Sequence, residues 1–221
     1  MTDLIYGLMA VGALLVCVIP HEVAHGYVAW KLGDPTAKAA GRLTLNPIQH
    51  LDPIGSLILP LGLLLLRRYA GFPVVFGWAK PVPINPYYFR DTWGGMLYVS
   101  LAGPGTNVAM GLLAAGIGRA LVALGVTNAY VLAFFALVVL LSFVLALFNL
   151  VPVPPLDGSK ILAYFLPVRW RIALLRWEQF GFVIVVALLL LGVLQGVFMG
   201  AEAITFRLVG IRWALLSRLW G

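Results

Sequence analysis

The feature that most constrains this chain is a long apolar segment near its N-terminus that contains a cluster of ionisable side chains. Residues 4–19 are almost entirely apolar, and a helical pattern continues to Leu32. A helix of this length can cross a bilayer core of about 30 Å, at about 1.5 Å per residue. His21, Glu22 and His25 lie within it. Because an ionisable group at bilayer depth is costly, such a cluster indicates a functional site.

The spacing of these three side chains suggests which chemistry the site performs. Positions i and i+4 of a helix share one face, so His21 and His25 can reach one metal ion with Glu22 beside them. In the H-E-x-x-H pattern the two histidines bind zinc, and the glutamate is the general base that activates a water molecule. The alternative is a chance match on a buried helix, with both histidines satisfied by hydrogen bonds.

The composition favours the membrane interpretation. The chain has 221 residues, of which 62% are hydrophobic and 10% charged, whereas a soluble domain is about 45–50% apolar and about 25% charged. The formal net charge is +7, which in a soluble protein would suggest nucleic acid. Here the Lys and Arg residues mostly flank apolar runs, so we expect them to anchor and orient the chain against membrane lipid, with no nucleic-acid partner.

The order of the apolar runs predicts an all-α polytopic membrane protein with about five to six transmembrane helices and re-entrant or extended loop segments. The expected spans are residues 4–32, 93–124, 130–150 and 179–200, with a shorter apolar run over 54–66. A short helix over 159–166, then a basic loop, and an interfacial amphipathic helix over 203–220 complete the prediction. We expect one domain over 1–221, with its catalytic core over about 1–166.

One segment between the spans does not have a helical pattern. Residues 72–86 carry four prolines in an extended-looking run. Irregular backbone at membrane depth is tolerated only against protein or a water-filled cavity. Two interpretations stay open. The segment either offers its backbone to a substrate strand, or forms a surface loop with aromatic anchors.

A catalytic zinc usually takes three protein ligands and leaves one position for water, so a third ligand is needed. Asp157 follows an apolar span, lies in a Pro-rich turn and precedes a glycine, which lets its carboxylate project inward. An ordinary turn or a helix N-cap is the alternative. His50 and Asp52 lie in a loop that can fold over the site. Cys17 shares the helix face of His21, but a small buried hydrophobe is the simpler interpretation.

Asn149 lies eight residues before Asp157, at the end of the same apolar span. Peptide hydrolysis develops negative charge on the carbonyl oxygen, and an amide N–H can stabilise that charge. A helix-capping role is the alternative. The positive-inside tendency favours an external N-terminus and a site nearer the cytoplasmic face.

Two motifs together resemble the site-2 protease family of intramembrane zinc metalloproteases, peptidase family M50. They are His21-Glu22-Val23-Ala24-His25 and Asn149…Pro152…Pro155-Leu156-Asp157-Gly158. Residues 33–55, 76–83 and 102–107 resemble compact bacterial members of that family, and the likeness covers about residues 15–165. No PDZ-like or CBS domain is visible, unlike in larger relatives.

The resemblance implies that His21, His25 and Asp157 bind one Zn²⁺ and that Glu22 is the base. It also implies that Asn149 helps to hold the substrate or the oxyanion. The expected substrate is a transmembrane segment of a protein in the bacterial cell membrane, cut within the bilayer. For His50 and Asn107 we expect substrate contact or packing near the site.

Two rival functions remain at this stage. A membrane metal-ion transporter would also place His and Asp side chains in the bilayer, although it has no need of Glu22 between the ligands. An inactive relative that binds membrane partners is the second, although the expected catalytic residues are all present.

Overall fold

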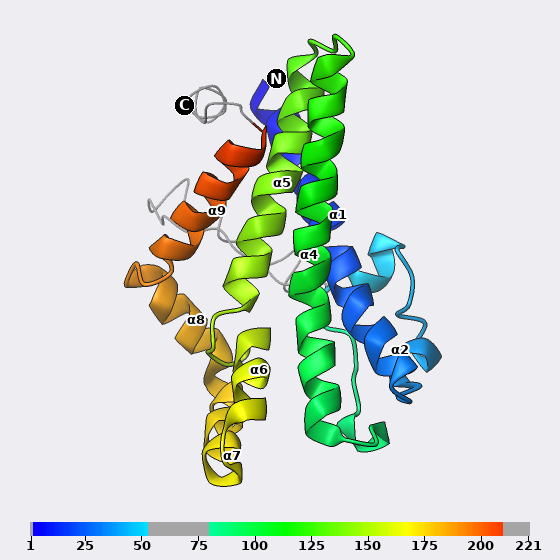
Figure 1. Ribbon diagram of the computed structural model, residues 1–221, viewed down its shortest axis with the longest axis vertical. Helices are drawn as coiled ribbons and strands as arrows, with labels where there is room; N and C mark the ends of the chain where they lie inside the picture. Colours follow the sequence, from blue (N-terminus) through cyan, green and yellow to red (C-terminus); the bar gives the residue numbers. More distant parts are fainter. Residues whose placement is uncertain (1, 53–79, 210–221) are drawn as a thin grey trace.

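The computed structural model describes residues 2–52 and 80–209, and within those ranges it is helical with no strand (Figure 1). The helices are α1 (Thr2–Lys31), α2 (Thr36–Ala39), α4 (Thr92–Ala123), α5 (Ala129–Asn149), α6 (Asp157–Phe165), α7 (Val168–Arg176), α8 (Gly181–Leu190) and α9 (Gln195–Val209). Single 3₁₀ turns occur at Pro47–His50, Pro86–Tyr88 and Trp177–Phe180.

Three of these helices are long and apolar enough to cross a membrane: Gly7–Lys31 within α1, all of α4 and all of α5. They agree to within two residues with the spans expected at 4–32, 93–124 and 130–150. Their ends carry recognisable signals. The Asp91 carboxylate accepts a hydrogen bond from the Trp93 amide at the start of α4, and Asn128 does the same for α5. The chain is therefore an integral membrane protein.

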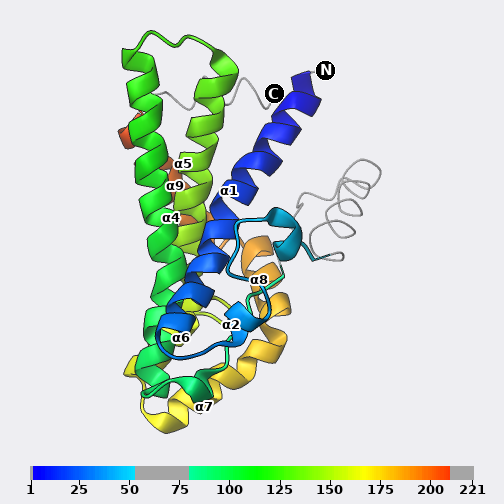
Figure 2. The same cartoon turned by 90° about the vertical axis from the view of Figure 1, so that its right-hand side faces the viewer.

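The three spans pack into one bundle (Figures 1 and 2). Figure 1 shows α4 and α5 side by side along the long axis of the molecule, and in Figure 2 α1 runs beside both. The main buried cluster contains Ala13 and Cys17 of α1, Ala114 and Ala115 of α4, and Ala201 of α9, together with larger apolar side chains of α5. Small residues on three of the four helices allow the close approach that helices make in membranes.

The C-terminal region differs from the prediction. Residues 179–200 do not form one span, because α8 ends at Leu190 and α9 begins at Gln195. Gly192 lies in the turn between them with a φ of +70°, a left-handed conformation that favours glycine. The helical segments Val168–Phe180 and Val183–Leu190 pass the span test only as a pair bent by 80°.

The basic loop expected after residue 166 is also a helix, α7. An interfacial helix is expected over 203–220, but residues 203–209 form the end of α9. This helix packs against α5, with Ala201 and Thr205 buried. The described ranges hold three candidate spans, or four if the bent pair counts as one, so the expected count of five to six is not confirmed. The apolar run 54–66 and the tail 210–220 lie outside the described residues.

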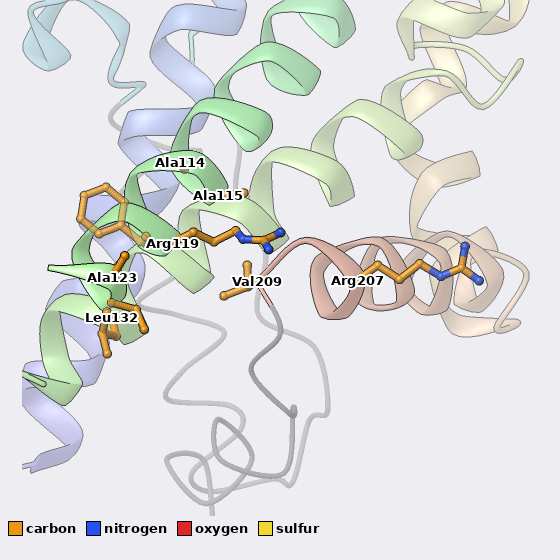
Figure 3. A pocket seen from close by; sticks show the side chains of 10 residues that line it. Ala114, Ala115, Arg119, Ala123, Leu132, Arg207 and Val209 are labelled. Atoms are coloured by element: carbon orange, nitrogen blue, oxygen red, sulfur yellow. The ribbon is translucent and has the colours of Figure 1, made fainter. Parts of the chain in front are cut away.

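A cavity of about 420 Å³ lies between α4, α5 and α9, lined by Ala114, Ala115 and Arg119 among others (Figure 3). In Figure 3 the Arg119 side chain extends toward Val209, whereas Arg207 points away along α9, so the two charges are not brought together. This cavity is near the C-terminal end of α4, well away from the histidines described below.

Candidate metal centre

Helix α1 presents His21, Glu22 and His25 to the interior of the bundle. Both histidines are 7% exposed, and their Nε2 atoms are 3.0 Å apart. The i, i+4 spacing on a continuous helix puts them on one face, as the motif predicted. Two imidazoles so close and so buried need either a shared ligand or hydrogen-bond partners of their own.

Asp157 is the first residue of α6 and completes the group. Its Oδ2 atom lies 3.5 Å from His21 Nε2 and 3.2 Å from His25 Nε2. Leu156 is the N-cap residue of α6 and makes no side-chain capping bond. The Asp157 carboxylate therefore does not cap the helix but faces the two histidines across the bundle.

These three ligand atoms fit a zinc ion. Zn–N and Zn–O bonds of about 2.0–2.2 Å in a tetrahedron place ligand atoms about 3.3–3.6 Å apart. The three separations here, 3.0, 3.2 and 3.5 Å, are close to that range. Asp157 Oδ2 is also buried without a hydrogen-bond partner in the described structure. A cation between the three atoms would satisfy it.

The other ring nitrogen of His25 has the partner that metal binding requires. Its Nδ1 atom lies 2.7 Å from the carbonyl oxygen of Val99 in α4. A carbonyl can only accept, so the imidazole proton is on Nδ1 and the Nε2 lone pair faces His21 and Asp157. Ligand histidines commonly donate their second N–H in this way, which sets both the tautomer and the ring orientation.

Asn107 of α4 plays the corresponding part at His21. Its side-chain nitrogen is 3.1 Å from His21 Nδ1, and its Oδ1 is buried with no partner among the described residues. Oxygen and nitrogen of an amide are interchangeable by a half-turn of the side chain. In the turned orientation Oδ1 accepts from the Nδ1–H of His21, which leaves the His21 Nε2 lone pair for a metal.

Gly103 lets α4 approach the histidines closely. A Cβ atom at this position would lie 2.4 Å from His25 Nε2 and 2.5 Å from His21 Cε1. Any side chain would therefore collide with both imidazole rings. Because Gly103 and Asn107 are four residues apart, one face of α4 supplies both the gap for the rings and the partner for His21.

An irregular segment, residues 80–85, covers the other side of the motif. The Val82 amide donates to Glu22 Oε2 at 3.1 Å. The same segment is held at both ends, because the Asn85 amide donates to the buried Asp34 carboxylate at 2.7 Å and the Lys80 amide to the His50 carbonyl at 2.9 Å. The carboxylate of Glu22 is thus held beside the histidines by a backbone donor.

A cavity of about 190 Å³ opens onto these groups. It is lined by His21, Glu22, His25, Pro81, Val82, Ile84, Met96, Val99, Ser100, Asn149, Pro155, Asp157 and Lys160. Asn149, the last residue of α5, reaches the cavity while its amide nitrogen donates to the Leu145 carbonyl at 3.0 Å. An amide nitrogen has two hydrogens, so one remains for a bound molecule.

Four candidates from the sequence do not line this cavity. His50 is buried, with Nε2 2.7 Å from the Thr44 carbonyl, and Asn107 is fully buried behind His21. Neither lines the cavity. The Cys17 thiol faces Ser142 at 3.3 Å inside the bundle and is not part of the metal-binding group. Asp52 is not among the residues that line the cavity either.

Four further residues contribute to the site although no motif in the sequence marks them individually: Val82, Val99, Gly103 and Lys160. The sequence contained a signal for two of them. Gly103 is on the same helix face as Asn107, and Lys160 follows Asp157 by three residues, so both lie on faces already marked by a candidate residue. Val82 and Val99 contribute backbone atoms, which residue type does not reveal.

Comparison with known proteins agrees with this chemistry. Residues 120–192 match the model of peptidase family M50. The chain is 41% identical over 186 residues to a Bacillus subtilis protein named "Putative zinc metalloprotease YwhC", covering 79% of this chain and 77% of the relative. It is 31% identical over 218 residues to a Mycobacterium tuberculosis protein named "Putative zinc metalloprotease Rip2", covering 96% of this chain and 80% of the relative.

No solved structure matches the chain. The two relatives are matched over more than three quarters of their own length. Zinc is accordingly the cofactor, and the His-His-Asp group is a site of the right kind for it. The chain belongs to peptidase family M50, the site-2 protease type of zinc metalloprotease.

Proposed function

We propose that this protease hydrolyses peptide bonds within transmembrane segments of other membrane proteins. The observation that carries the proposal is the position of the His21, His25 and Asp157 group on helices of a membrane bundle, with Glu22 at its side. Ligands placed inside the bundle put the chemistry at bilayer depth. We further propose that residues 1–221 act as one domain and that the site is nearer the cytoplasmic face.

His21, His25 and Asp157 would hold the zinc ion, with Val99 and Asn107 setting the orientation of the two rings. Zinc bound there supplies Lewis acidity, which makes a water acidic near neutral pH and polarises a carbonyl group. Three protein ligands leave one position open for this chemistry. The Asp157 charge also offsets part of the charge of the cation in a buried site.

Glu22 acts as the general base and then as the general acid. Its carboxylate accepts the proton of the attacking water and later donates a proton to the leaving amine. The Val82 amide, 3.1 Å from Oε2, orients this carboxylate toward the cavity. The free amide hydrogen of Asn149 donates to the carbonyl oxygen of the scissile bond as negative charge develops there.

The substrate must be unwound at the cut site, because an intact helix uses its own carbonyls in hydrogen bonds. The cavity of about 190 Å³ is large enough for a short extended stretch of chain but not for a helix, since a helix with its side chains is about 10 Å across. Residues 80–85 cannot pair with such a stretch through a full set of β-type backbone hydrogen bonds, because N–H donors that they would need are missing or already used. Pro81 and Pro83 have no N–H, and the Val82 N–H is bonded to Glu22.

Removal of the metal tests the proposal. We expect the detergent-solubilised protein to cut a model transmembrane substrate, to stop when a zinc chelator is added, and to recover when zinc is restored. Cleavage is read by gel and the cut position by mass spectrometry. Cutting that persists with no bound zinc would refute the proposed metal chemistry, and cutting only outside the apolar segment would refute the proposed substrate.

Asp157→Ala is expected to lower zinc occupancy well below one ion per chain and to remove cleavage. The loss removes one of three ligands and leaves two buried imidazoles facing an empty position. Zinc content is measured by elemental analysis of purified protein. Glu202→Ala is the control, because Glu202 is an exposed carboxylate on α9. Full zinc content in Asp157→Ala would exclude Asp157 as a ligand.

A further inference from the structure

The wall of the catalytic cavity formed by α6 carries a cationic side chain. Lys160 is the one lysine or arginine among the described residues that line this cavity. It follows Asp157 by three residues, and residues three apart on a helix are neighbours on one face. The helix that brings the third metal ligand to the site therefore brings an ammonium group with it.

This ammonium group has a charged partner outside the set of residues that line the cavity. Lys160 Nζ is 3.5 Å from Glu178 Oε1, and the side chains are 26% and 46% exposed. Glu178 belongs to the 3₁₀ turn between α7 and α8. An ion pair exposed to this degree contributes little to stability and separates readily. Lys160 can therefore exchange Glu178 for another negative charge without unfolding its surroundings.

The cavity has few other donors for such a charge. During hydrolysis the new C–O bond moves the electron pair of the carbonyl double bond onto its oxygen, which becomes anionic. A donor aimed at that oxygen is worth most in a site that excludes bulk water. Asn149 has one N–H engaged by the Leu145 carbonyl, whereas a lysine has three N–H donors, a full charge and a flexible stem.

We propose that Lys160 is a catalytic residue that binds the oxygen of the scissile carbonyl. Its Nζ leaves Glu178 and donates a hydrogen bond to that oxygen as negative charge develops, and it remains protonated throughout. Lys160 releases the oxygen when the carbonyl re-forms and the amine leaves with the proton from Glu22. This role rests on the proposed function, because it requires a peptide in the cavity.

The kinetics of peptide cleavage by two Lys160 variants test the role. Lys160→Met keeps the length of the side chain and removes its charge. We expect kcat to fall about 10²-fold, as for loss of one oxyanion donor, with KM changed less than about threefold and zinc content unchanged. Lys160→Arg keeps the charge and should recover much of the loss. The substrate has no acidic residue near the cut, so the charge can act only on the backbone.

Glu178→Gln separates catalysis from stability. It breaks the same ion pair but leaves Lys160 free, so we expect kcat close to that of the unaltered protein. Thermal unfolding of both variants is measured in parallel. If Glu178→Gln loses as much activity as Lys160→Met, the ion pair is structural and the proposal is wrong. A KM effect without a kcat effect would also overturn it.

A binding experiment distinguishes failure of this proposal from failure of the proposed function. A phosphinate peptide carries a tetrahedral anion where the scissile bond would be. We expect Lys160→Met to bind it about 10²-fold more weakly, while an uncharged peptide of the same sequence binds both proteins equally. If the unaltered protein neither cuts the substrate nor binds the phosphinate, the proposed function fails. If it does both and Lys160→Met matches it, only the role of Lys160 fails.

Discussion

We expect Glu22→Gln to abolish peptide cleavage while the protein keeps its zinc. Glutamine has the shape of glutamate, and its carbonyl oxygen can still accept the Val82 amide. It cannot take a proton from water at neutral pH, so the general base is lost. General acid–base catalysis contributes about 10²–10⁴-fold, and here one residue performs both steps. Cleavage of a model transmembrane substrate and zinc content are measured on the same preparation.

The control for Glu22→Gln is Glu202→Gln, which removes an exposed carboxylate of α9. It should cut like the unaltered protein. If Glu22→Gln keeps more than about one tenth of the activity, the base is another residue, since general-base catalysis is worth at least about 10²-fold. If the variant loses its zinc as well, Glu22 is needed for zinc binding, and the loss of cleavage is then explained by the loss of zinc.

The second large effect is expected from Gly103→Ala, the smallest change possible at that position. The added carbon would lie 2.4 Å from His25 Nε2 and 2.5 Å from His21 Cε1, well inside van der Waals contact. The His25 ring cannot simply rotate away, because its Nδ1 is hydrogen-bonded to the Val99 carbonyl of α4, the helix that also carries Gly103. Either α4 moves outward or the rings turn, and both separate the three ligand atoms. We therefore expect loss of zinc and of cleavage.

Gly105→Ala is the matched control in the same helix. A Cβ there has no atom within 4 Å, and alanine is preferred to glycine in a helix by about 1 kcal/mol. Gly105→Ala should keep full zinc content and activity and unfold at the same or a higher temperature. Gly103→Ala with normal zinc content would mean that α4 does not approach the histidines as closely as described.

Some of the metal site follows from local sequence. His21, Glu22 and His25 lie within a single turn of one helix, so their spacing alone sets their common face. The sequence favours Asp157 as the third ligand because a Pro-rich turn after an apolar span can point a carboxylate inward. The structure brings it within 3.5 Å of both histidines, and its role as a ligand stays a proposal.

The spans were predictable to different degrees for a physical reason. Helices α1, α4 and α5 are each apolar over at least about 20 residues, which is what crossing a bilayer requires. The region 179–200 has the same composition, yet Gly192 interrupts it with a left-handed turn. A sequence pattern does not distinguish an apolar helix that crosses lipid from two that pack on other helices, as α9 does on α5.

The sequence by itself determined the membrane class, the three long helices and the chemistry of the metal group, because these depend on side-chain type and on helical spacing. The tertiary structure alone decided which partners complete the group. The Val99 carbonyl, the Val82 amide and the gap at Gly103 are backbone features that exist only once α1, α4 and the segment 80–85 have packed. Asn107 and Lys160 have polar side chains, but only packing shows that one lies behind a histidine and the other beside the cavity.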